Sequence, residues 1–289
     1  MALLHKKDSV GFIALSNGPA LMMKDTFEQL EQVLKEMGLN VIWAPKLYRQ
    51  ESVFQASDSE KAEMLMDFYR NDELVAIFDV SGGDLANGVL SYLDYDLMKR
   101  YPKPFFGYSD LSVVVNGLYT KTHHKTYLYQ IRNLVSEDAS KQQQWFKETL
   151  FHQKDTLFQF DVEWIQGETL EGELIGGNIR CFLKLAGTPY LPSFEKKILL
   201  LESYSGDVAK MATYLNQYKQ MGVFEQINGL ILGSFTEMEQ KQYEPDIVSL
   251  VKSIVNLPQL PIVKTSQIGH GPDSKCAIIG ERLMMKKEG

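Results

Sequence analysis

Short apolar runs alternate with amphipathic stretches along the first half of the chain. The apolar runs have the length of buried strands and cover residues 10–16, 41–44, 74–80 and 104–108. The stretches between and after them have helical character and cover residues 25–37, 59–70 and 110–119. Asp25 and Glu28 resemble a capping box in the first of these helices. Strands interleaved with helices predict an α/β fold built on a doubly wound, mostly parallel sheet.

The pattern changes after residue 135. Residues 136–168 are polar, rich in Gln and Lys, and lack clear periodicity, which indicates a connector that is part helix and part loop. Strand-like runs then return at residues 198–201, 229–235, 262–268 and 277–279, with helical stretches at 208–221 and 247–255. We therefore predict an N-terminal α/β domain over residues 1–135, the connector, and a smaller, β-rich α/β domain over residues 169–289.

Composition and charge narrow the classes of partner. The formal net charge is −7 and no dense block of Lys or Arg is present, so nucleic acid is not an expected partner. The apolar run at residues 10–15 is too short for a signal peptide or a membrane span, so we expect a cytoplasmic protein without membrane contact. Cys181 and Cys276 both lie in apolar runs and are expected to be buried thiols.

Ser109 lies between a predicted strand and a predicted helix, in the segment Pro-Phe-Phe-Gly-Tyr-Ser-Asp-Leu at 104–111. A hydroxyl at such a turn is lifted above the sheet edge, and the first helical amides can stabilise an oxyanion. The segment is not a complete Gly-x-Ser-x-Gly elbow, because Leu111 occupies the last glycine position. An ordinary helix N-cap is the alternative interpretation of Ser109.

Three further candidate functional groups follow predicted strands: a glycine pair, a carboxylate and an imidazole. Gly82 and Gly83 come directly after the strand ending at residue 80, where they let a backbone approach a ligand, or form only a tight turn. Glu202 ends an apolar strand, as either a cleft residue or a solvated terminus. His270 lies between two glycines after another strand and is the best candidate for a general base.

These groups match the division of labour in a catalytic triad. Histidine takes the proton of the serine, and the carboxylate orients the imidazole and stabilises its cation. Ser109, Glu202 and His270 are therefore the predicted triad. His123 and His124 are adjacent and do not share one helix face, and no other cluster has metal-ligand spacing. No metal and no cofactor is expected.

At these residues the chain resembles the serine peptidase family of LD-carboxypeptidases and microcin C immunity peptidases. The motifs that carry the resemblance are Gly-Gly-Asp at 82–84, Gly-Tyr-Ser-Asp at 107–110, Ile-Gly-Gly-Asn at 175–178, Leu-Glu at 201–202 and Gly-His-Gly at 269–271. The resemblance implies a Ser-Glu-His triad shared between two domains, with Ser109 in the first and Glu202 and His270 in the second. It also implies an oxyanion hole formed by the amides of Gly83 and Asp110, and a homodimer without metal. The residues that it implies for substrate binding are Gly82, Asp84, Tyr108 and Asn178.

The segments at residues 81–87 and 92–96 are more similar to the immunity-peptidase branch than to the murein enzymes, which usually carry Arg-Gly-Gly-Tyr-Gly at the first position. That branch stacks a nucleotide base on an aromatic side chain, for which Trp145 and Trp164 are candidates; core packing is the other interpretation of both.

Several functions follow as hypotheses. The first is release of a C-terminal D-amino acid from murein peptides, and the second is cleavage of peptidyl- or aminoacyl-nucleotide conjugates. Both make the substrate a small peptide or a peptide-nucleotide conjugate. A catalytically silent peptide-binding protein is the third hypothesis. An unrelated α/β-hydrolase is disfavoured by the missing elbow glycine and by the long separation of Glu202 from His270.

Overall fold

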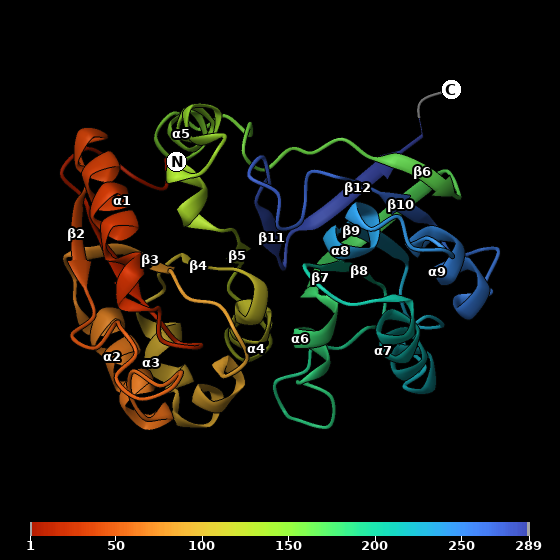
Figure 1. Ribbon diagram of the computed structural model, residues 1–289, viewed down its shortest axis with the longest axis horizontal. Helices are drawn as coiled ribbons and strands as arrows, with labels where there is room; N and C mark the ends of the chain where they lie inside the picture. The colour runs from red at the N-terminus through yellow and green to blue at the C-terminus, as the bar shows by residue number, and fades with distance from the viewer. Residues whose placement is uncertain (1, 288–289) are drawn as a thin grey trace.

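The N-terminal half of the chain supplies five strands of a six-stranded sheet, and the sixth comes from residues 277–279. The computed structural model describes residues 2–287. The strand order is β11-β5-β4-β3-β1-β2, and every neighbouring pair is parallel except β11 with β5. The strands are β1 (Ser9–Ile13), β2 (Asn40–Trp43), β3 (Leu74–Asp79), β4 (Phe105–Gly107), β5 (Thr126–Leu128) and β11 (Ala277–Ile279). The first five carry the predicted doubly wound pattern, and β11 returns to this sheet from the far end of the chain (Figure 1).

Helices cover both faces of this sheet, because successive strand residues point to opposite sides. Val10 and Phe12 of β1 pack in one apolar cluster with α1 (Lys24–Glu36), whereas Ile13 packs in the other cluster with α2 (Asp58–Arg70). The remaining helical elements of this half are α3 (Tyr95–Arg100), α4 (Ser112–Thr122) and the 3-10 turns η1 (Leu21–Met23), η2 (Ala86–Tyr92), η3 (Ser109–Leu111) and η4 (Ile131–Val135).

The predicted capping box at Asp25 and Glu28 is wrong. Helix α1 begins at Lys24, directly after the turn η1, and its N-cap Met23 makes no side-chain cap. Asp25 therefore lies inside the first turn, where a carboxylate favours the positive end of the helix dipole. The capping box of this half is at α2 instead, where Ser57 and Glu60 bond each other's backbone amides.

The segment predicted as a connector contacts both halves. It contains α5 (Ala139–Phe146), the π-helical turn η5 (Lys147–Phe151) and the strand β6 (Glu163–Gln166). Phe146 stacks obliquely on Phe78 of β3, with ring centroids 6.1 Å apart, so α5 belongs to the packing of the first sheet. Strand β6 pairs with the second sheet. We propose that the domain boundaries lie at residues 135 and 168.

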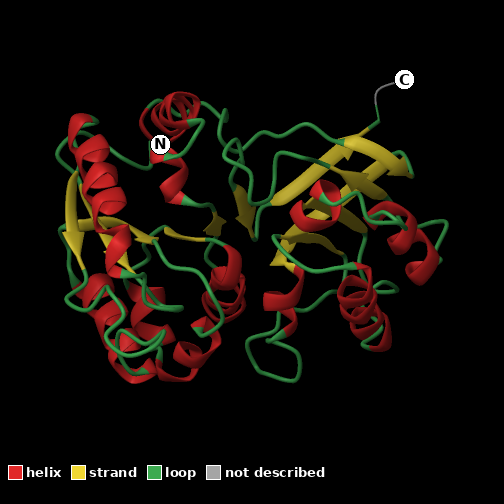
Figure 2. Cartoon of the chain, in the orientation of Figure 1, coloured by secondary structure: helices red, strands yellow, loops and turns green. Residues whose placement is uncertain are grey.

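The C-terminal half forms a second six-stranded sheet in the order β12-β7-β8-β9-β10-β6. The four central strands are parallel, and the two edge strands are antiparallel to their neighbours. Its elements are β7 (Thr169–Asn178), β8 (Lys197–Ser203), β9 (Gly229–Phe235), β10 (Ile262–Lys264), β12 (Arg282–Lys286), α6 (Ile179–Leu183), α7 (Val208–Gln220), α8 (Thr236–Gln240) and α9 (Ile247–Val255). The predicted fold class, two mostly parallel α/β sheets in N-terminal and C-terminal domains, is confirmed (Figure 2).

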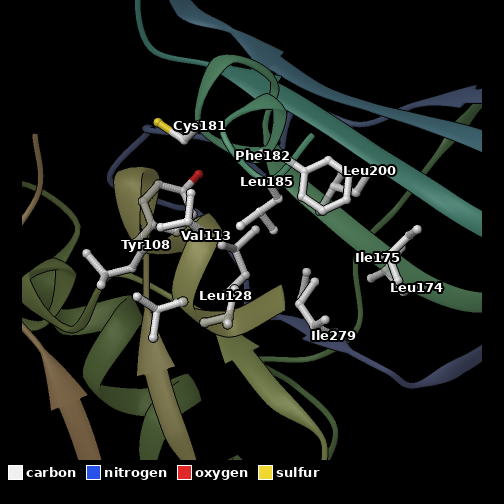
Figure 3. Packing of buried hydrophobic residues seen from close by; sticks show 14 of the residues in the cluster. Tyr108, Val113, Leu128, Leu174, Ile175, Cys181, Phe182, Leu185, Leu200 and Ile279 are labelled. Carbon is white, nitrogen blue, oxygen red and sulfur yellow. The ribbon is translucent and has the colours of Figure 1, made fainter. Parts of the chain in front are cut away.

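An apolar core joins the two halves. Tyr108 and Val113, from the region of β4 and α4, belong to the same buried cluster as Phe182 and Leu185 from the region of α6 (Figure 3). Burial of this apolar surface holds the ends of β4 and β8 close to each other. Cys181 and Cys276 are buried free thiols as predicted, and burial raises the pKa of both. Within residues 2–287, no helix is long and apolar enough to span a membrane.

Candidate active site

Ser109 occupies a sharp turn between a strand and a helix. Strand β4 ends at Gly107, and the backbone of Tyr108 is extended. Ser109 has a φ of 57°, in the left-handed region that residues other than glycine rarely adopt. Neither Tyr108, the N-cap of η3, nor Leu111, the N-cap of α4, makes a side-chain cap, and Ser109 is itself not an N-cap. The geometry therefore favours a half-buried hydroxyl held by backbone strain over the N-cap interpretation.

The side chain of Asp110 anchors this turn from below. Its carboxylate is fully buried and accepts hydrogen bonds from the Ser16 hydroxyl at 2.6 Å and the Ala86 amide at 2.9 Å. Lys184 of the second half donates to the other carboxylate oxygen at 2.5 Å. A buried carboxylate that accepts from one cationic and two neutral donors is a strong anchor. It fixes the backbone amide of residue 110 next to Ser109.

Glu202 and His270 are in direct contact. The Nδ1 atom of His270 lies 2.7 Å from Oε2 of Glu202, whose side chain is completely buried at the end of β8. Asn178 donates to the other carboxylate oxygen at 3.1 Å, and the Tyr108 hydroxyl donates to Oε2 at 3.3 Å. Burial and the charge of Glu202 raise the pKa of Tyr108 well above its usual value, so the phenol stays protonated and acts as a donor.

The loop that carries His270 requires its glycines. A Cβ atom on Gly269 would collide with the Ser234 hydroxyl, and one on Gly233 would lie 2.9 Å from the Glu202 Cβ. The close approach that these glycines permit brings the imidazole over Glu202. The ring lies between Tyr108 and Tyr204, at centroid distances of 4.9 and 5.0 Å. These contacts hold the imidazole in one orientation.

Ser109 and His270 line one cavity of about 480 Å³ at the carboxyl ends of the strands. The other lining residues are Met23, Thr26, Gly82, Tyr108, Gln130, Arg132, Asn133, Val135, Ser136, Tyr204, Gly269 and Gly271. Among the described residues no hydrogen bond joins Ser109 to His270, so they share the cavity without a direct bond. Such bonds are often long in unliganded enzymes and shorten when substrate binds.

The structure separates the predicted substrate contacts into two groups. Gly82 and Tyr108 line the cavity. Asp84 does not; it pairs with Arg180, and its carbonyl accepts a hydrogen bond from Lys184 at 2.8 Å. Asn178 is buried, accepts a bond from the Cys181 amide at the start of α6, and supports Glu202 from behind.

The remaining predicted groups lie around this site or away from it. Gly83, predicted to supply an oxyanion-hole amide, has φ of 133°, and a Cβ atom there would collide with the Asn17 side chain. Lys141 and Lys275 cover the Trp145 ring, and Trp164 lies in β6, so neither indole lines the catalytic cavity. Within residues 2–287, no group of three or more His, Cys, Asp or Glu side chains is arranged to hold a metal ion.

Sequence reasoning missed the polar wall formed by Gln130, Arg132, Asn133 and Ser136. These residues follow β5, which lies beside β4, so their position at the carboxyl edge of a parallel sheet was the available signal. The prediction overlooked it because the short apolar run at 126–128 was not identified as a strand.

Removal of the Tyr108 hydroxyl is expected to have a small effect. In Tyr108→Phe, Glu202 loses one long hydrogen bond but keeps Asn178 and His270. One such bond contributes about 1 kcal/mol, so kcat should fall roughly 3- to 10-fold. Steady-state kinetics would measure this, and circular dichroism would verify the fold. A loss of about 10³-fold would show that the phenol contacts the reacting atoms.

Comparison with known proteins gives a consistent picture. Two family models match: the LD-carboxypeptidase N-terminal domain over residues 10–129 and the LD-carboxypeptidase C-terminal domain over residues 171–285. A Bacillus subtilis protein named "probable murein peptide carboxypeptidase" is 27% identical over 98% of this chain and 90% of its own length.

Two solved structures share the fold. MccF in complex with glutamyl sulfamoyl guanosine superposes with a TM-score of 0.87 at 18% identity, covering 99% of this chain and 98% of that one. A muramoyltetrapeptide carboxypeptidase from Oxalobacter formigenes gives a TM-score of 0.82 at 21% identity, covering 97% and 95%. At these identities the likeness describes the fold.

Proposed function

Because the chain belongs to the LD-carboxypeptidase family of peptidases, we propose that it is a serine-type carboxypeptidase that releases a C-terminal D-amino acid from murein peptides. The observation that carries the proposal is the His270–Glu202 contact of 2.7 Å at the wall of a cavity that Ser109 also lines. A buried carboxylate behind an imidazole, facing a strained serine, is the arrangement that acyl transfer requires.

The proposed reaction begins with attack of the Ser109 oxygen on the carbonyl of the scissile amide, while Nε2 of His270 takes the hydroxyl proton. Glu202, bonded to Nδ1, stabilises the imidazolium that forms. The amides of Gly83 and Asp110 stabilise the negative oxygen of the tetrahedral intermediate. His270 then gives its proton to the leaving amine, which departs as the free amino acid. Water hydrolyses the acyl-enzyme with His270 acting again as base and acid.

Cleavage of a peptidyl- or aminoacyl-nucleotide conjugate is the second candidate. It is favoured by the shared fold with MccF, whose solved complex contains glutamyl sulfamoyl guanosine. The same triad chemistry would serve it, because the scissile bond is again an acyl bond. We also propose, from the family resemblance, a cytoplasmic homodimer that needs no nucleic acid, membrane or metal.

Mass spectrometry of reaction products tests these proposals. The substrate panel holds a murein tetrapeptide ending in D-alanine, its all-L counterpart and an aminoacyl sulfamoyl adenylate, each with wild type and with Ser109→Ala. Loss of D-alanine with wild type alone is the expected result. Cleavage of the adenylate alone would favour the second candidate, and binding without any turnover would favour a silent peptide-binding protein.

A further inference from the structure

The cavity that Ser109 and His270 line also carries a cationic group that the triad does not use. Arg132 and Asn133 lie in η4, which follows β5, the strand next to the one that positions Ser109. Both line the same cavity as Ser109 and His270. A ligand bound to these two side chains therefore lies in the same cavity as the proposed nucleophile.

Among the described residues, Arg132 has no anionic partner within ion-pair distance. Its Nε atom donates to the Gln130 side-chain oxygen at 3.0 Å, and within residues 2–287 its two terminal nitrogens make no hydrogen bond and no carboxylate lies within 4 Å. Burial lowers the pKa of Arg132, while the charge of Asp79 opposes the shift. Because guanidinium stays protonated in proteins, a partly buried cation remains without a direct ion pair among the described residues, and the charge of Asp79 acts on it only from beyond ion-pair distance. The bond that Arg132 donates to Gln130 fixes the plane of the fork and leaves its outer edge free.

Asn133 gives an independent indication of a ligand. Its side chain is 8% exposed, and its Nδ2 atom is buried without a hydrogen-bond partner among the described residues. Buried N–H groups are nearly always paired, and Asn133 lines the cavity, so its donor is free for an acceptor bound there once the side chain rotates toward the cavity. Its neighbour in the wall is a guanidinium, so the acceptor is expected to be an anion.

We propose that Arg132 and Asn133 form a carboxylate-binding subsite that selects substrates with a free carboxylate beside the scissile bond. The planar fork of Arg132 matches a carboxylate in two parallel hydrogen bonds. This proposal deepens the proposed function, since it explains why the enzyme would act at a chain end. Two sources can supply the group: the C-terminal carboxylate of the leaving residue or an acidic side chain on the acyl part.

Kinetics with paired peptides separate these sources. The first pair is a murein tetrapeptide that ends in D-alanine with a free carboxylate and the same peptide that ends in D-alaninamide. The second pair is the first of these peptides and its variant in which the D-glutamate carboxylate is an amide. Wild type should prefer the C-terminal acid by about 10²-fold in kcat/KM, and Arg132→Gln should remove most of that preference. Wild type and Arg132→Gln should cleave the D-alaninamide peptide with kcat/KM values within about threefold of each other. If Arg132→Gln loses a wild-type preference only between the two peptides of the second pair, the acidic side chain is the ligand of the subsite.

Matched variants guard against a general structural effect. Arg100→Gln, at an exposed position of α3, should leave both rates unchanged. Arg132→Lys keeps the charge but loses the fork, so it should restore only part of the preference. Equal losses on acid and amide in Arg132→Gln, or an unchanged preference, would overturn the subsite.

Binding measurements keep the subsite testable if no peptide is cleaved. Isothermal titration of the Ser109→Ala protein with the same acid and amide should give tighter binding of the acid. Adding Arg132→Gln should weaken acid binding about 10²-fold and leave amide binding unchanged. This result without turnover would reject the proposed function but keep the subsite, whereas equal binding of acid and amide in both peptide pairs would reject the subsite itself.

Discussion

Ser109→Ala is expected to lower kcat by about 10⁴- to 10⁶-fold, because the proposed nucleophile is removed and only binding and oxyanion stabilisation remain. The fold should persist. Alanine and serine pay a similar cost for the left-handed backbone at this position, and the hydroxyl makes no hydrogen bond among the described residues. Single-turnover release of D-alanine measures the loss, and thermal unfolding measures stability.

Two companion variants sharpen this result. Ser140→Ala, the same change at an exposed position of α5, should have full activity. Ser109→Gly should be as inactive as Ser109→Ala but about 1 kcal/mol more stable, because glycine adopts φ of 57° without strain. Residual activity above about 1% of wild type in either Ser109 variant would show that another group is the nucleophile.

Glu202→Gln is expected to lower kcat by about 10³- to 10⁴-fold. The amide has nearly the same shape but no charge to stabilise the imidazolium of His270. If its nitrogen faces His270, the imidazole takes the opposite tautomer and Nε2 cannot accept the serine proton. Stopped-flow or steady-state measurement of D-alanine release gives the loss in kcat.

The same substitution is expected to reduce the free energy of unfolding by about 1–3 kcal/mol. Asn178, Tyr108 and His270 all contact the buried carboxylate, so a glutamine must direct its N–H group at one of these partners. Glu195→Gln, at an exposed position, is the matched control and should change neither quantity. A kcat within tenfold of wild type would remove Glu202 from the triad.

Much of the architecture follows from the period of apolar residues. Runs such as residues 74–80 are buried on both faces, which is typical of parallel strands, and the polar groups after them meet at one edge. That edge made Ser109, Glu202 and His270 candidates, and the family resemblance selected them as a group. Their roles as a triad stay a proposal, whereas the contact of Glu202 with His270 is observed.

Local sequence signals were less informative at positions where tertiary packing determines the start of a helix or the direction of a side chain. Asp25 and Glu28 have capping spacing, yet the turn η1 begins the helix earlier. Asn178 belongs to a motif that suggested substrate contact, but packing of α6 directs its side chain toward Glu202. The direction of a side chain after a turn depends on neighbours distant in sequence, and the left-handed backbone of Ser109 is likewise not visible in residue types.

Strand β11 has a consequence for the order in which the enzyme matures during synthesis. Residues 277–279 complete the sheet that holds Ser109, although residues 9–128 supply all its other strands. Until the ribosome has made this late segment, the edge of β5 lacks its partner, and exposed edges favour pairing between chains. His270 also emerges only shortly before that point. The growing chain therefore gains the edge strand β11 and His270, the proposed base, at nearly the same moment, so the proposed site does not form before both segments have been made.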